Sequence, residues 1–175
     1  MPVDIYKTVF DKYFSSKQFE IDFNSALEVL QKSERIFFIG NGGSNSICSH
    51  MMEDFAKIAR FPTFSFSDAS LITCFSNDYG YENAIAEWLK IHFKSTDLLV
   101  AISSSGNSKN ILNAVDFANL TNGNLITLSG FENTNQLKTK GEVNFHIEVK
   151  NYGVVECFHQ VILHMLLDKY AAQSR

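Results

Sequence analysis

The chain has 175 residues, of which 45% are hydrophobic and 16 are phenylalanine, a composition that argues against disorder and predicts a well-filled core. The 15 basic and 19 acidic residues give a net charge of −4 with no basic stripe, which argues against nucleic acid as the main partner. No apolar run approaches the roughly 18 residues needed to cross a membrane. Residues 1–10 also lack the apolar core of a signal peptide, so we expect no membrane partner.

The three cysteines, Cys48, Cys74 and Cys157, are scattered along the chain without the CxxC spacing of a metal or redox motif. Such a set fits a reducing compartment, so we expect a cytoplasmic protein. Each cysteine is expected to be a buried small hydrophobic residue rather than a nucleophile.

Two stretches with helical periodicity, residues 4–14 and 18–30, come first. In the second stretch Phe19, Phe23 and Leu27 fall on one helical face. The break at Ser15-Ser16 predicts a helical hairpin, at residues 1–33, that packs on the rest of the chain and contacts another subunit.

Short apolar runs then alternate with helical patterns to the end of the chain. The predicted strands are 35–39, 63–66, 98–102, 125–128 and 143–149. The predicted helices are 45–60, 69–75, 81–93, 111–120 and 154–170, with polar loops at 76–80 and 132–139. This alternation predicts a three-layer α/β fold with a five-stranded parallel sheet, and the lack of any linker predicts one domain over 1–175.

A glycine-rich turn, Gly40-Asn41-Gly42-Gly43-Ser44, joins the first strand to the next helix. At such a junction a helix N-terminus presents unpaired N–H groups and a positive dipole end, which suit a phosphate. The turn is neither a dinucleotide motif, because Asn45 replaces the third glycine, nor a nucleoside-triphosphate loop, because Gly-Lys-Ser/Thr is missing. By itself it indicates a ligand site and a plain tight turn about equally.

A serine-rich loop follows the strand 98–102 in the same strand–turn–helix arrangement. Its hydroxyls and backbone N–H groups can form a neutral phosphate cradle without lysine. Two such junctions in one parallel domain favour phosphate binding over two plain turns. The candidate phosphate ligands are Ser103, Ser104, Ser105 and Ser108.

Four segments together resemble, in order and spacing, the sugar isomerase (SIS) family, and within it the phosphoheptose isomerases. They are Gly40–Ser44, Ser67–Ser70, Asn77–Gly80 and Ile102–Ser108. The resemblance covers about 35–170 and implies an SIS-type fold in cytoplasmic homotetramers with active sites between subunits. It implies the interconversion of sedoheptulose 7-phosphate and D-glycero-D-manno-heptose 7-phosphate, a step towards the heptoses of bacterial lipopolysaccharide or capsule, in a site where several members hold zinc.

The resemblance also implies residue roles. The serine loop would hold the phosphate, the glycine turn would line the sugar pocket, and Asp78 would contact sugar hydroxyls. The substrate-binding set is Asn41, Gly42, Gly43, Ser44, Asp78, Ser103, Ser104, Ser105, Ser108 and Glu156. The metal-binding set, with zinc as the expected divalent metal, is His50, Asp54, Glu156 and His164.

Two of these positions depart from the family pattern. The family has a histidine followed four residues later by a glutamate, and here Asp54 follows His50, so the neighbouring Glu53 stands as the alternative catalytic carboxylate. The family also has a glutamine eight residues before its last histidine. Counting back from His164 places Glu156 there, whereas a register anchored on residues 152–153 places His159 there.

The expected chemistry is proton transfer between C1 and C2 of the sugar through an enediol(ate), with His164 and either Asp54 or Glu53 as the acid–base pair. Which group abstracts the proton stays open. Two carboxylates close together favour a bound cation between them. The competing interpretation is that Glu156 faces solvent at the start of the last helix, where the helix dipole favours an anion.

Three other interpretations stay open. The chain could be a non-catalytic SIS module that binds a sugar phosphate or a protein. It could also be an isomerase of another phosphosugar. Finally, each histidine could be an ordinary residue of an amphipathic helix, with Asp54 paired to Lys57 on a solvated face.

Overall fold

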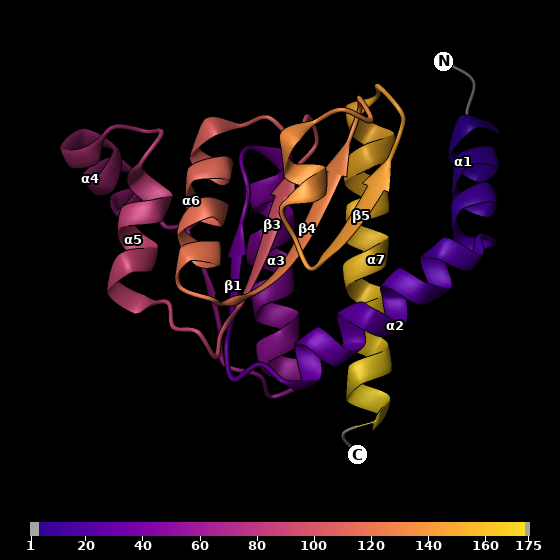
Figure 1. Ribbon diagram of the computed structural model, residues 1–175, viewed down its shortest axis with the longest axis horizontal. Coiled ribbons are helices and arrows are strands. Elements are labelled where there is room, and N and C mark those ends of the chain that lie inside the picture. Colours follow the sequence, from indigo (N-terminus) through magenta and orange to yellow (C-terminus); the bar gives the residue numbers. More distant parts are fainter. Residues whose placement is uncertain (1–3, 174–175) are drawn as a thin grey trace.

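The computed structural model describes residues 4–173, which form a five-stranded parallel sheet covered by helices on both faces (Figure 1). The strand order is β2-β1-β3-β4-β5, and each neighbouring pair is parallel. The predicted fold class is therefore confirmed. The strands are β1 Ile36–Ile39, β2 Thr63–Ser65, β3 Leu98–Ser103, β4 Asn124–Gly130 and β5 Val143–Ile147.

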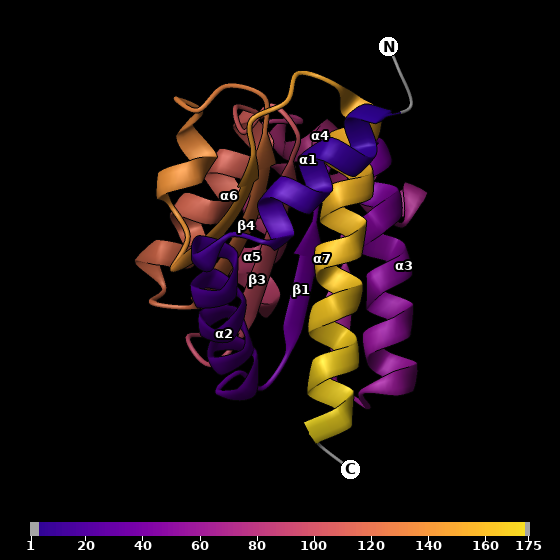
Figure 2. The same cartoon turned by 90° about the vertical axis from the view of Figure 1, so that its right-hand side faces the viewer.

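Helices flank the sheet in two layers. The helices are α1 Asp4–Phe14, α2 Lys17–Gln31, α3 Gly43–Ile58, α4 Ala69–Tyr79, α5 Ala84–His92, α6 Lys109–Leu120 and α7 Tyr152–Gln173, with a short 3₁₀ helix η1 Gln136–Thr139. Helices α2, α3 and α7 cover one face (Figure 2), and α5 and α6 cover the other. Within residues 4–173, none of these helices combines the length and apolar character needed to span a bilayer.

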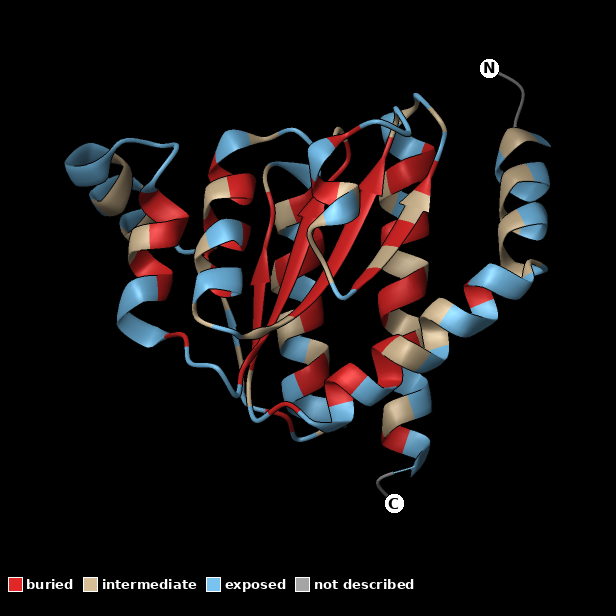
Figure 3. Ribbon diagram, viewed as in Figure 1, coloured by how far each residue is buried: buried red, intermediate tan, exposed pale blue. Residues whose placement is uncertain are grey.

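The central strands β1 and β3 are mainly apolar because the middle of the sheet is buried on both faces, whereas the edge strands β2 and β5 also carry polar residues that are not buried. In β1, Phe38 contributes to the core beneath α3 and α7, whereas the adjacent Phe37 contributes to the core beneath α5 and α6. The Phe38 ring lies 5.6 Å from that of Phe55, and the Phe37 ring lies 5.5 Å from that of Trp88. Figure 3 shows the strands buried along most of their length.

The two helices predicted before the sheet are confirmed. Ser16 caps α2, its Oγ accepting a hydrogen bond of 3.1 Å from the backbone N–H of Phe19. Helices α1 and α2 meet at an angle (Figure 1). Aromatic rings of α1 contact α7. The Tyr13 ring lies 4.5 Å from that of Phe158 on α7.

The prediction of a polar loop at 76–80 is wrong, because residues 76–79 form the last turn of α4. Asp68 starts this helix by accepting hydrogen bonds from the N–H groups of Ser70 and Leu71. Gly80, with φ of +77°, ends it, and its N–H bonds to the Ser76 carbonyl at 3.0 Å. The signal that ends the helix is thus the glycine and not the polar run before it.

The expected burial of all three cysteines holds for Cys48 alone. Cys48 lies on the buried face of α3, and this burial raises the pKa of its thiol. Cys74 and Cys157 are exposed, so their predicted burial is wrong.

Candidate functional site

The glycine turn and the serine loop meet at the carboxyl edge of the sheet. Their strands, β1 and β3, are hydrogen-bonded neighbours, with Ile39 opposite Ala101. Because both strands are parallel, the segments that leave them emerge at the same edge, where open α/β sheets bind ligands. The two candidate phosphate loops predicted from the sequence therefore belong to one site.

The glycine turn brings backbone close to two neighbouring groups. Gly42 has φ of +54°, a conformation that favours glycine, and α3 begins at the next residue. A Cβ on Gly40 would lie 2.8 Å from the Ser44 carbonyl oxygen, and one on Gly43 would lie 2.5 Å from Oε1 of Glu156. The carboxylate of Glu156 thus rests against the N-terminus of α3, where the helix dipole favours an anion.

The serine loop is held from two sides. Ser103 Oγ donates a hydrogen bond of 3.2 Å to Ser108 Oγ, and the N–H of Leu137 donates one of 3.0 Å to the carbonyl of Gly106. Gly106 has φ of +64°, and any side chain there would overlap Asn135. The loop conformation therefore depends on glycine and on the segment that follows β4.

A cavity of about 140 Å³, which we call the serine cavity, lies between the two loops and the start of α7. Ser104 is only 6% exposed, and its hydroxyl has no hydrogen-bond partner among residues 4–173. A buried hydroxyl without a partner is costly, so Ser104 is a candidate donor to a ligand in this cavity. The cavity is lined by Asn41, Ser44, Ile102, Ser103, Ser104, Ser105, Ser108, Tyr152 and Glu156.

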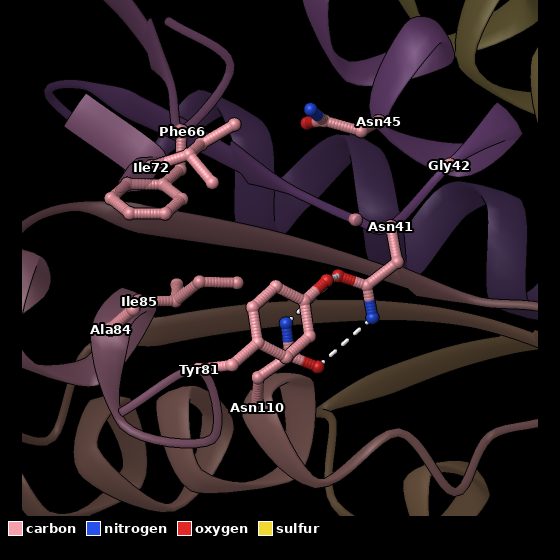
Figure 4. A pocket seen from close by; sticks show the side chains of 10 residues that line it. Asn41, Gly42, Asn45, Phe66, Ile72, Tyr81, Ala84, Ile85 and Asn110 are labelled. Carbon is pink, nitrogen blue, oxygen red and sulfur yellow. Dashed lines mark hydrogen bonds between the residues drawn. The ribbon is translucent and has the colours of Figure 1, made fainter. Parts of the chain in front are cut away.

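A second cavity of about 130 Å³ lies beside the first, and Asn41 lines both (Figure 4). Its wall combines amide and hydroxyl groups with the apolar side chains of Phe66, Ile72 and Ile85. Gly42 lines this second cavity and not the first. Of the four turn residues predicted to contact sugar, Asn41 and Ser44 therefore line the serine cavity, and Gly43 lies beneath Glu156.

A carboxylate and two imidazoles converge where α3 packs against α7. Nε2 of His50 lies 3.4 Å from Oδ2 of Asp54, and Nδ1 of His164 lies 3.9 Å from the same oxygen. The two imidazole rings are 5.3 Å apart between centroids. Asp54 thus lies within reach of both histidines, and its place beside His50 agrees with the spacing of four residues on α3.

This group fits a divalent metal. One ligand atom from each of His50, Asp54 and His164 can be chosen so that all lie within 4.8 Å of one another. Two imidazole nitrogens and one carboxylate oxygen are a common ligand set for catalytic zinc, which keeps a further position for water or substrate. Glu156, predicted as a fourth ligand, does not join the group but lies with the serine cavity.

The structure also separates the alternatives left open by the sequence. Glu53 is exposed and stands outside the group, so Asp54 is the carboxylate that meets His164. His159 is fully buried, with Nε2 3.2 Å from the carbonyl oxygen of Ser129, and burial lowers its pKa to about 4. Glu156 lines the cavity beside the serine loop and His159 does not.

Asp78 lies apart from this arrangement. It sits on the exposed part of α4, accepts a hydrogen bond of 2.9 Å from the Asn77 side chain, and lines neither cavity. The expected contact of Asp78 with sugar hydroxyls therefore remains a prediction.

Several side chains at the site were missed from the sequence. Nε2 of Gln160 lies 2.9 Å from Nε2 of His164, one helical turn further along α7. Tyr81 and Asn110 meet Asn41, and Tyr152 lines the serine cavity. Gln160 could have been found from the sequence, because it lies four residues before His164 on the same predicted helix. Tyr81, Asn110 and Tyr152 can be recognised only once the segments are packed together.

The chain is similar in sequence to known proteins. The model of the SIS domain family matches residues 15–130. The phosphoheptose isomerase of Fusobacterium nucleatum is 32% identical over 145 residues, which cover 80% of this chain and 74% of that protein.

Two solved structures share the fold. Phosphoheptose isomerase from Neisseria gonorrhoeae superposes with a TM-score of 0.85 at 22% identity, covering 95% of this chain and 93% of that one. Phosphoheptose isomerase from Francisella tularensis superposes with a TM-score of 0.80 at 22% identity, covering 99% of each chain. The chain belongs to the SIS domain family, in which it is a homologue of the phosphoheptose isomerases.

Proposed function

We propose that this protein is an aldose–ketose isomerase that interconverts sedoheptulose 7-phosphate and D-glycero-D-manno-heptose 7-phosphate, for bacterial surface heptose synthesis. The observation that carries the proposal is the pairing of an Asp54–His164 group with a buried serine cradle. Glu156 at the cradle and His164 at the group are eight residues apart on α7, a rise of about 12 Å. An extended sugar phosphate can reach from one to the other.

The phosphate end of the substrate belongs in the serine cavity. Hydroxyls and backbone N–H groups of the loop 103–108 donate to the phosphate oxygens, and the unpartnered hydroxyl of Ser104 gains an acceptor. Asn41 and Ser44 line the same cavity and contact the sugar beyond the phosphate. The carboxylate of Glu156 accepts hydrogen bonds from sugar hydroxyls.

The reacting carbons belong at Asp54 and His164. A base removes the proton from the carbon next to the carbonyl group, and the neighbouring carbon receives a proton when the enediol(ate) collapses. The hydroxyl proton passes between the two sugar oxygens, so that the reaction is balanced without an oxidant. A divalent metal held by His50, Asp54 and His164 would polarise these oxygens as a Lewis acid.

We further propose a cytoplasmic homotetramer of single-domain chains with sites at subunit contacts. Helix α1 contains no buried residue in the isolated chain although its face carries aromatic side chains. An apolar groove of about 350 Å³ also lies on α3 and α7 beside Glu156. Both surfaces are suited to contact with another copy of the chain.

The substrate assignment is tested by following ketose phosphates of five, six and seven carbons by NMR, with and without added zinc. We expect aldose formation to be fastest for sedoheptulose 7-phosphate. Faster turnover of a shorter ketose would make the protein an isomerase of another phosphosugar. Tight binding without turnover of any of them would instead support the non-catalytic SIS module.

Replacing Ser104 with alanine should weaken substrate binding without destabilising the free protein. The lost hydrogen bond to a charged group contributes about 1.5–3 kcal/mol, which should appear mainly as a raised KM. The free protein loses only a buried hydroxyl that has no partner among the described residues, so its Tm should stay equal or rise.

Ser76→Ala is the matched control, because the Ser76 hydroxyl is also buried and unpartnered within 4–173 but lines neither cavity. Its KM should equal that of the wild type. An unchanged KM for Ser104→Ala would remove the serine loop from the phosphate site.

A further inference from the structure

A hydrogen-bonded network joins three side chains at the wall between the two cavities (Figure 4). The amide of Asn41 and the amide of Asn110 bond reciprocally: Asn41 Nδ2 donates to Asn110 Oδ1 at 2.9 Å, and Asn110 Nδ2 donates to Asn41 Oδ1 at 2.8 Å. The hydroxyl of Tyr81 donates to the same Asn41 oxygen at 2.8 Å. Asn41 is thus held by two partners.

The partners come from different segments of the chain. Asn41 lies in the glycine turn after β1, and Asn110 is the second residue of α6, directly after the serine loop. Tyr81 lies between α4 and α5. The network therefore links the two loops of the proposed sugar-phosphate site to each other and to the segment after α4.

Asn110 is buried in this network at a cost in free energy. It is only 3% exposed, and a buried amide must find partners to offset the loss of water. Its side chain faces Asn41 rather than solvent, although most polar residues of α6 are exposed or half-buried. An apolar residue would fill the same position without this requirement, so the pairing points to a role beyond packing.

The network also decides what Asn41 can offer to a ligand. An amide oxygen accepts two hydrogen bonds, and that of Asn41 receives both, from Asn110 and Tyr81. One of the two N–H groups of Asn41 is used by Asn110. The capacity that remains is one N–H donor, which suits the oxygens of a phosphorylated sugar.

We propose that Asn110 and Tyr81 are positioning residues that hold Asn41 as a hydrogen-bond donor and fasten the glycine turn to the serine loop. Neither needs to touch the substrate, since both act through Asn41. The inference deepens the proposed function and rests on it for the kinetic experiment, whereas the fastening of the two loops can be measured without any activity.

The stabilisation of the glycine turn by Asn110 is measured by hydrogen exchange with mass spectrometry on the free protein. In Asn110→Ala, peptides that cover the glycine turn at 40–47 should exchange about tenfold faster, because two hydrogen bonds to the turn are lost. Asn113→Ala is the matched control, since Asn113 lies one turn later on α6 and donates to the Glu82 carbonyl instead. Its exchange in the glycine turn should equal that of the wild type.

The action through Asn41 is measured by a double-mutant cycle with sedoheptulose 7-phosphate. Asn110→Ala should raise KM about tenfold with a smaller change in kcat, and it should add little in an Asn41→Ala background. Tyr81→Phe should raise KM a few-fold for the same reason and keeps the test available if Asn110→Ala folds poorly. Tyr79→Phe, on α4, should leave KM unchanged.

Unchanged exchange in the glycine turn of both Asn110→Ala and Tyr81→Phe would overturn the inference. So would additive effects of Asn41→Ala and Asn110→Ala on KM, which would show that Asn110 acts independently of Asn41. If the wild-type protein turns over no sugar phosphate, the proposed function fails, and the exchange experiment alone decides whether the network fastens the loops.

Discussion

Replacing His164 with asparagine should lower kcat by about 10²–10⁴, the range expected for loss of a general acid or base. The imidazole Nδ1 lies 3.9 Å from Oδ2 of Asp54, and the ring is part of the only carboxylate–imidazole group of this kind found within residues 4–173. Asparagine is of similar size but cannot exchange a proton near neutral pH. Asp54→Asn should have an effect of the same order.

Two controls separate the loss of the Asp54–His164 group from general changes in packing or charge. His92→Asn removes a histidine at the exposed end of α5, and Asp168→Asn removes an exposed carboxylate on α7, the helix that carries His164. Both should leave kcat unchanged. Substantial turnover by both His164→Asn and Asp54→Asn would remove this group from the reaction.

Removal of bound metal should abolish most of the activity, and zinc should restore it. His50, Asp54 and His164 provide three ligands in the arrangement of a catalytic site, so we expect about one divalent ion per chain in the purified protein. His50→Asn should lower the metal content, because it removes one ligand while leaving Asp54 and His164 in place. Elemental analysis with parallel rate measurements tests this expectation.

The Glu156→Gln variant tests whether Glu156 is a metal ligand, as expected from the sequence, or lies outside the metal-binding group, as in the structure. Its carboxylate lies against Gly43 at the serine cavity, outside the His50–Asp54–His164 group, so the metal content should not change. A metal-free preparation that turns over at the full rate would exclude a catalytic role for the metal.

The centre of the sheet could be predicted because β1 and β3 are mainly apolar on both faces and are followed by glycine-rich or polar turns. The runs that form β1 and β3 are short, buried and followed directly by the two candidate loops. The end of α4 could not be predicted in the same way. A helix whose last turn is mostly exposed tolerates Asn77 and Asp78, so polarity there does not mark a loop.

Within the site, the sequence predicted what lies on a single helix better than what depends on packing. The pairing of His50 with Asp54 follows from a spacing of four residues. The place of Glu156 depends on how α7 crosses the glycine turn, and its contact with Gly43 is visible only in three dimensions. The pairing of Asn41 with Asn110 likewise depends on β1 and β3 being neighbours in the sheet.

The central claim is that Asp54 and His164 move a proton between C1 and C2 of a heptose phosphate. The most direct measurement is NMR of sedoheptulose 7-phosphate incubated in D₂O with zinc-supplemented protein. The proposed isomerase activity predicts an aldose product that carries deuterium at C2, formed by the wild type and by His92→Asn but not by His164→Asn on the same timescale. If folded, zinc-loaded wild-type protein forms no aldose from this substrate, the assignment as a heptose phosphate isomerase is wrong.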